Sequence, residues 1–67
     1  MGELWRTVRE AQGYEVSTDG RVRNKKTGRI LKTHPNNGSG KPQVTLMDNH
    51  FRLTRLVETL MRDAFPR

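Results

Sequence analysis

The chain has 67 residues, no cysteine and a formal net charge of +6 at pH 7, and only 31% of its residues are hydrophobic. This length allows one domain, residues 1–67, with a small core, because a domain of this size buries only about 60% of the surface of its unfolded chain. The sequence excludes a disulfide scaffold, a thiolate metal site and, for want of an apolar run of about 20 residues, a membrane-spanning helix, so we expect a cytoplasmic protein.

The first strands are predicted by apolar residues that alternate with polar ones. Leu4, Trp5 and Val8 form the first apolar group, which we interpret as a short opening strand. Residues 14–17 have the period of two that is typical of a half-buried strand, and residues 17–20 supply the polar side chains and the glycine of a tight turn. The alternation resumes directly after this turn, so an antiparallel partner strand is expected there.

A basic hairpin is predicted next. If Val22 points to the core, Arg21 and Arg23 must point to the opposite face. Residues 24–28 have the composition of a hairpin loop that ends on a left-handed glycine, and residues 29–32 are expected to return as a strand. The Pro, Asn, Gly and Ser residues that follow at 35–40 predict a loop.

A second hairpin is predicted in the C-terminal half. Residues 43–47 and 51–53 alternate around a turn at 48–50. The side chains expected on the apolar face of this hairpin are Val44, Leu46, Phe51 and Leu53.

From Leu53 onward the hydrophobic period changes to that of an amphipathic helix. Apolar residues recur at i, i+3, i+4, i+7, i+8, i+11 and i+12 from Leu53 to Phe65. Thr54 is the expected N-cap, and Pro66 ends the helix. We therefore expect an α+β fold, in which one small antiparallel sheet of about four to five short strands packs against one C-terminal amphipathic helix.

The positive charge is concentrated in residues 21–41, which contain seven Lys or Arg residues and no Asp or Glu. Such a segment can steer a polyanion onto one surface, and neutralising phosphates releases condensed counterions. We expect contacts with duplex DNA from Arg21, Arg23, Lys25, Lys26, Arg29, Lys32, Lys41 and Arg52. Arg21 and Arg23 are the expected groove contacts, because an Arg fork binds guanine or phosphate in bidentate fashion and a two-stranded ribbon can enter a major groove.

No catalytic or metal-binding constellation is found in the sequence. His34 and His50 have no second His, Cys or paired carboxylate at ligand spacing. We therefore expect no metal site, no cofactor and no enzymatic activity. Trp5 and Tyr14 are expected in the core rather than stacked on bases.

A series of short motifs resembles a known family. The motifs lie, in order, at residues 4–6, 14–17, 20–23, 28–32, 44–46 and 55–57. They are similar to the nuclease-associated modular domain, fourth of its series, that precedes the catalytic core of many phage HNH homing endonucleases. The resemblance implies a DNA-binding β-sheet module, and we expect this chain to carry that module without the nuclease core.

The chain departs from the family pattern at three places, and these departures motivate an alternative. Lys41 stands where the family has an aromatic residue, Thr54 stands where it has His, and the expected helix is about one turn longer. The alternative is a small phage protein that binds a host protein through its basic face or its C-terminal helix. A cryptic nuclease is the third and weakest hypothesis.

Overall fold

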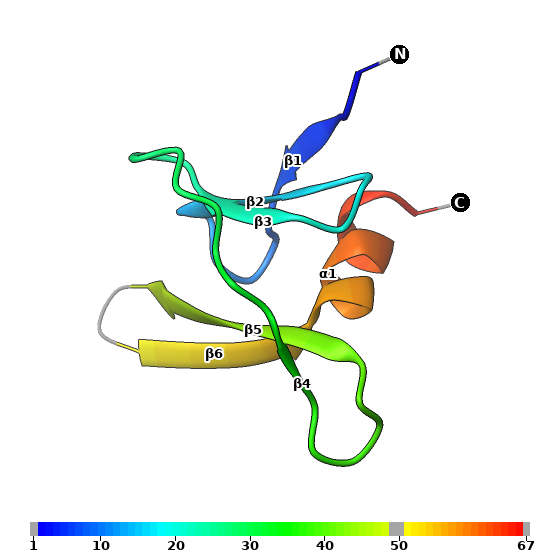
Figure 1. Ribbon diagram of the computed structural model, residues 1–67. Helices are drawn as coiled ribbons and strands as arrows, with labels where there is room; N and C mark the ends of the chain where they lie inside the picture. Colours follow the sequence, from blue (N-terminus) through cyan, green and yellow to red (C-terminus); the bar gives the residue numbers. More distant parts are fainter. Residues whose placement is uncertain (1, 49–50, 67) are drawn as a thin grey trace.

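The computed structural model describes residues 2–48 and 51–66, and it contains two antiparallel sheets followed by one helix (Figure 1). The first sheet consists of β1 (Trp5–Thr7), β2 (Tyr14–Ser17) and β3 (Val22–Asn24), and the second sheet consists of β4 (His34–Pro35), β5 (Pro42–Asp48) and β6 (Phe51–Leu56). The helix is α1 (Val57–Ala64). The α+β class and the C-terminal helix are confirmed, but the single sheet of four to five strands is wrong, because six strands form two sheets.

The first sheet follows the predicted alternation closely. β2 pairs with β1 on one side, with Trp5 opposite Ser17, and with β3 on the other, with Val16 opposite Val22. Gly20 has a φ of 83° in the predicted turn, a conformation that costs a glycine little. The buried Ser17 hydroxyl oxygen accepts backbone N–H bonds from Asp19 and Arg21, both at 3.1 Å, so a side chain fixes this turn.

The predicted return strand at residues 29–32 is wrong. After the expected left-handed Gly28, with a φ of 74°, the chain makes one isolated antiparallel bridge between Arg23 and Ile30. The Leu31 N–H then donates to the Val22 carbonyl at 2.8 Å, after which the chain leaves β3 for the second sheet. Leu31 packs on the core, whereas Ile30 is 43% exposed. This segment is therefore attached to the fold by the Leu31 side chain and a single bridge, and not by a continuous strand pairing.

The second sheet is built on the predicted second hairpin. β5 and β6 pair from Gln43 opposite Leu56 to Asp48 opposite Phe51. Val44 and Leu46 are fully buried as expected, but Phe51 is 50% exposed because it lies at the end of the hairpin, beyond the core cluster. The rest of the predicted turn, including His50, lies outside the described residues. The two-residue strand β4 was not predicted.

The helix begins later than its sequence period predicts. Residues 53–56 continue β6, and α1 starts at Val57 with Leu56 as its N-cap and no side-chain capping bond. The expected N-cap Thr54 is wrong, because Thr54 lies opposite Thr45 in the ladder, where their hydroxyl groups are 3.3 Å apart. The β5 partner strand therefore overrides the helical period until the pairing ends. No helix among the described residues is long and apolar enough to cross a bilayer.

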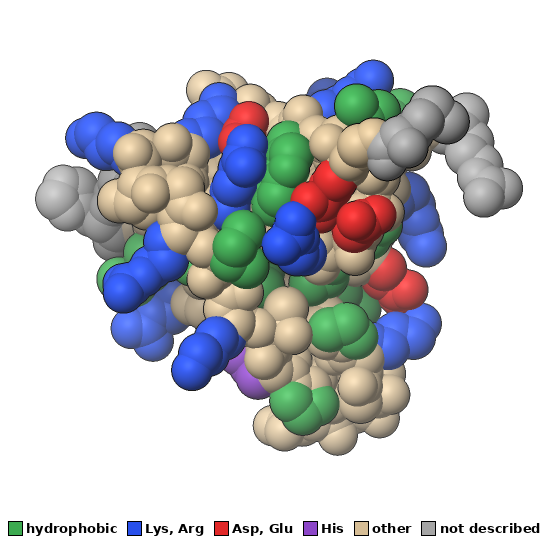
Figure 2. Space-filling view, turned by 45° about the horizontal axis from the view of Figure 1, so that its top comes forward, with side chains coloured by type: hydrophobic (Ala, Val, Ile, Leu, Met, Phe, Trp, Pro, Cys, Tyr) green, Lys and Arg blue, Asp and Glu red, His purple; other side chains and the backbone are tan. Residues whose placement is uncertain are grey.

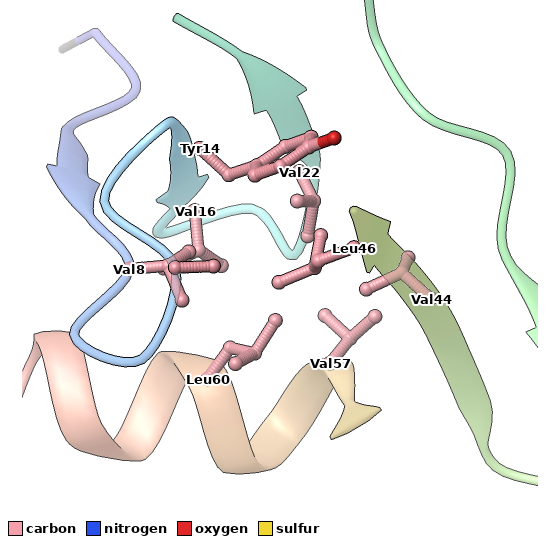
Figure 3. Close-up of a cluster of buried hydrophobic side chains, with 9 residues drawn as sticks. Val8, Tyr14, Val16, Val22, Val44, Leu46, Val57 and Leu60 are labelled. Carbon is pink, nitrogen blue, oxygen red and sulfur yellow. The ribbon is translucent and has the colours of Figure 1, made fainter. Parts of the chain in front are cut away.

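One hydrophobic core is shared by both sheets and the helix. Figure 3 shows side chains from β2, β3, β5 and α1 converging between these elements. The buried set is Val8, Ala11, Tyr14, Val16, Val22, Val44, Leu46, Val57 and Leu60. Because each small sheet supplies only a few of these residues, neither sheet has a core of its own.

The Tyr14 hydroxyl connects the two sheets across this core. It donates to the Met47 carbonyl oxygen at 3.1 Å and accepts the Met47 backbone N–H at 3.3 Å. Tyr14 itself is 8% exposed, so the expectation that it belongs to the core is confirmed. Its ring contributes apolar area while its hydroxyl group satisfies the backbone of β5.

The Tyr14→Phe variant tests this connection. It keeps the ring but leaves the Met47 N–H and carbonyl without their partner, so we expect a loss of about 1–3 kcal/mol in the free energy of unfolding. For a domain of this size, each kcal/mol lowers the melting temperature by about 4–8 °C. Thermal unfolding followed by circular dichroism measures the shift, and an unchanged melting temperature would contradict the assigned role.

Candidate nucleic-acid interface

The eight predicted DNA contacts do not share one sheet face. Arg21 and Arg23 lie at the first sheet, whereas Arg52 lies in β6 of the second sheet, opposite Met47. Between Arg23 and Arg52 in the chain, four more of the predicted contacts lie in the segment that connects β3 to β4, namely Lys25, Lys26, Arg29 and Lys32. Lys41 lies directly before β5. Arg52 was expected as a DNA contact of the single predicted sheet, but the strands divide into two sheets, so it lies on a different sheet from Arg21 and Arg23.

Arg21 and Arg23 belong to a compact group on the outer face of the first sheet, which we call the Trp5 cluster (Glu3, Trp5, Glu15, Arg21 and Arg23). The Arg21 Nε donates to Glu3 Oε2 at 2.9 Å, and its Nη2 pairs with the other carboxylate oxygen. The Arg23 Nε donates to Glu15 Oε1 at 3.0 Å. The guanidinium carbons of Arg21 and Arg23 lie 5.6 and 3.9 Å from the centroid of the Trp5 ring.

The strand register explains why these side chains meet. Glu15 and Arg23 are directly opposite on β2 and β3, and cross-strand partners point to the same face. Trp5 lies opposite Ser17, whose side chain is on the same face as Glu15 by the period of two. Trp5 is therefore half-buried beneath two arginine side chains. The expectation that it belongs to the main core is wrong.

The charges of the Trp5 cluster balance, since it holds two carboxylates and two guanidinium groups. The hydrogen bond from Arg21, and secondarily the Ser17 hydroxyl, lowers the pKa of Glu3 from 4.5 to about 2. Arg21 and Arg23 do lie on the face opposite the core, as predicted, with side chains 53% and 34% exposed. However, carboxylate partners already occupy part of each Arg fork, which sequence reasoning missed although Glu15 and Arg23 were both in the predicted hairpin.

Lys25, Lys26, Arg29 and Lys32 form a different group, which we call the free cations. All four are exposed, and none forms an ion pair with a carboxylate of the described residues. In Figure 2 Lys and Arg side chains are spread over the whole visible face, whereas most of the acidic side chains on it lie on the right, next to Lys or Arg side chains. This arrangement leaves uncompensated positive charge on the segment that crosses from the first sheet to the second.

Lys41 is less free, because its Nζ lies 3.0 Å from Glu58 Oε1 on α1. Both side chains are about half exposed, and an ion pair of this kind contributes only about 0–1 kcal/mol. A phosphate can therefore replace Glu58 as the partner of Lys41 at little loss.

A depression that the sequence did not reveal lies beside α1. It has a volume of about 580 Å³ and is lined by Thr18, Glu58, Met61, Arg62 and Phe65. Arg6 contacts the end of α1 near this depression: its Nη1 donates to the Ala64 carbonyl at 2.9 Å, and its guanidinium carbon lies 5.1 Å from the ring centroid of Phe65. The lining is mixed in polarity and charge.

Comparison with protein families gives one match. A family model described as the NUMOD4 motif matches residues 3–47, a range that spans β1 to β5 and includes the Trp5 cluster and the free cations. This motif is associated with the N-terminal regions of HNH homing endonucleases. No curated protein and no solved structure matches the chain significantly.

The depressed pKa of Glu3 predicts a pH dependence. Because the carboxylate is bound in the folded state, its contribution to stability is complete above the unfolded pKa of 4.5 and is lost as the pH falls through about 2. At pH 7 we expect the melting temperature of the wild type to be higher than that of the Glu3→Gln variant. This difference in melting temperature should disappear near pH 2. Thermal melts of both proteins between pH 7 and pH 2 measure this, and a constant difference would be the contrary result.

The close stacking of Arg23 on Trp5 predicts a structural role for this arginine. Arg23→Ala removes both the stacking and the bond to Glu15, so we expect a loss of about 1 kcal/mol in the free energy of unfolding. Arg9→Ala, at an exposed position outside the Trp5 cluster, is the control with the same charge change. Equal denaturant midpoints for the two variants would show that Arg23 is only a surface cation.

Proposed function

The chain belongs to the NUMOD4 family, and from this membership we propose that it is a non-catalytic module that binds duplex DNA. The proposal places the contact surface on the cations of residues 21–41, with Arg52 at its margin. It further assigns the protein to the cytoplasm of a bacterial cell, as a phage-encoded module. The non-catalytic part rests on the family motif, which is itself not a catalytic one.

The observation that carries this proposal is the exposed charge of the free cations. Lys25, Lys26, Arg29 and Lys32 are exposed and lack carboxylate partners among the described residues. Phosphates that bind them release counterions without displacing an intramolecular ion pair. Arg21 and Arg23 are weaker candidates, because a phosphate there competes with Glu3 and Glu15.

Contacts of this type position a protein on the duplex without reading its sequence. Lys and Arg contacts to phosphates supply most non-specific affinity, whereas base-edge contacts supply specificity. The free cations are three lysines and one arginine, and lysines bind phosphates as point charges without reading base edges. We therefore propose that affinity depends strongly on salt.

A second candidate function is the binding of a host protein. The observation that favours it is the depression beside α1, where Met61 and Phe65 offer apolar surface next to Glu58 and Arg62. This surface is separate from the free cations, so the two candidates respond to different substitutions. Met61→Ala would weaken a protein complex formed at the depression but leave DNA affinity unchanged.

Fluorescence anisotropy with a labelled random-sequence duplex at several salt concentrations tests DNA binding. Each phosphate contact contributes about 0.9 to the slope of log K against log salt, so we expect Lys25→Gln with Lys26→Gln to reduce that slope by about 1.8. These side chains are exposed, so the melting temperature should not change. If the wild type fails to bind at low salt, the DNA proposal is wrong and the host-protein candidate takes its place.

A further inference from the structure

Two turns of the chain have the same construction, although they lie twelve residues apart. The first turn occupies residues 24–28 and the second occupies residues 36–40. In the first, Asn24 Oδ1 accepts the backbone N–H groups of Lys26 at 2.8 Å and Thr27 at 3.1 Å. The Gly28 N–H donates to the Asn24 carbonyl at 2.8 Å, with Gly28 at a φ of 74°.

The second turn repeats each of these bonds. Asn36 Oδ1 accepts the backbone N–H groups of Gly38 at 2.8 Å and Ser39 at 3.1 Å. The Gly40 N–H donates to the Asn36 carbonyl at 2.8 Å, and Gly40 also has a φ of 74°. The turns therefore share an asparagine at the first position, a hydroxyl residue at the fourth and a left-handed glycine at the fifth.

Each turn is followed at once by a cation whose backbone is fixed on both sides. The Arg29 N–H donates to Thr27 Oγ1 at 3.2 Å, and its carbonyl accepts the Asn24 N–H at 3.0 Å. The Lys41 N–H donates to Ser39 Oγ at 3.3 Å, and its carbonyl accepts the Asn36 N–H at 2.8 Å. Since the backbone of each cation is already ordered, little further conformational entropy is lost when a ligand binds.

The first turn begins the segment that leaves β3, and the second turn joins β4 to β5 within the second sheet; Figure 1 shows the two turns well apart. The Cα atoms of Arg29 and Asn36 are separated by seven residues, which reach at most about 25 Å when extended. This upper limit allows the two turns to span a DNA major groove, which is about 12 Å wide, and the segment between the turns carries the exposed Lys32. No Asp or Glu lies anywhere between the two turns.

We propose that the two turns are matched phosphate-binding elements that hold the two DNA strands bordering one major groove. Arg29 contacts the backbone on one side and Lys41 the backbone on the other, while Lys32 lies over the groove between them. This inference rests on the proposed DNA binding and assigns it a geometry. Lys41 exchanges its exposed Glu58 partner for a phosphate, which the weakness of that ion pair permits.

The first test compares charge removal at the two turns with charge removal elsewhere. Arg29→Gln with Lys41→Gln should lower the slope of log K against log salt by about 1.8, because two phosphate contacts are lost. The control is Arg9→Gln with Arg62→Gln, which removes the same charge at exposed positions outside the segment and should leave the slope nearly unchanged. Thermal melts confirm that both proteins remain folded.

Two charge-neutral variants test the turn construction itself. Asn24→Ala and Asn36→Ala each remove the side-chain acceptor that orders one turn, so each should weaken binding about threefold to tenfold through the added ordering of the chain. Affinity unchanged in both variants would show that the cations act without the turns. The charge variants above remain informative if either alanine variant fails to fold.

The groove assignment is tested with a duplex that carries bulky substituents on C5 of its pyrimidines, which project into the major groove. We expect this duplex to bind at least tenfold more weakly than the unmodified one. Equal affinities would overturn the groove assignment. If the wild type binds but the Arg29/Lys41 and Arg9/Arg62 variants have the same slope of log K against log salt, the turns are not phosphate-binding elements and the proposal of DNA binding stands. If the wild type binds no duplex, the proposal of DNA binding and the proposal for the turns both fail.

Discussion

The structure depends on one packing constraint, namely that two sheets of three short strands must bury their apolar faces against each other and against α1. Val16 and Val22 from the first sheet meet Leu46 from β5 and Leu60 from the helix in a single core. A chain of this size cannot build two cores. The Tyr14 hydroxyl adds a directional link, since it satisfies the Met47 backbone across the same boundary.

This constraint also decides where charge can be exposed. With its inner face in the core, the first sheet presents only its outer face, and there the Trp5 cluster pairs each arginine with a carboxylate. The cluster thereby stabilises the sheet rather than offering free charge. The chain must next cross to the second sheet, and the crossing segment carries the cations that no described carboxylate neutralises.

The segment of residues 24–41 is ordered near both of its ends by side chains of its own. Asn24 and Asn36 each order a turn through their carbonyl oxygens, and Leu31 fastens the middle of the segment to the core. A positively charged segment that is ordered before it meets a ligand loses less entropy on binding than a flexible tail does. Within the range matched by the NUMOD4 motif, the most basic part of the chain is thus also firmly positioned.

The sequence by itself determined the local features of this protein. The alternation at residues 14–17 and 43–47, the left-handed Gly20 and Gly28, and the presence of a C-terminal helix were all predicted, because each depends on neighbours within a few residues. The concentration of positive charge in residues 21–41 was also evident from composition alone.

Only the tertiary structure decided how far each strand pairing extends and that the strands form two sheets. Residues 53–56 fit a helix by period, but the β5 partner makes them a strand, and residues 29–32 fit a strand but have only one bridge to β3. Likewise, the Glu3 carboxylate that binds Arg21 lies eighteen residues away in the chain. Local sequence cannot fix such choices, because they depend on the free energy of contacts with partner strands and with residues far away in the chain.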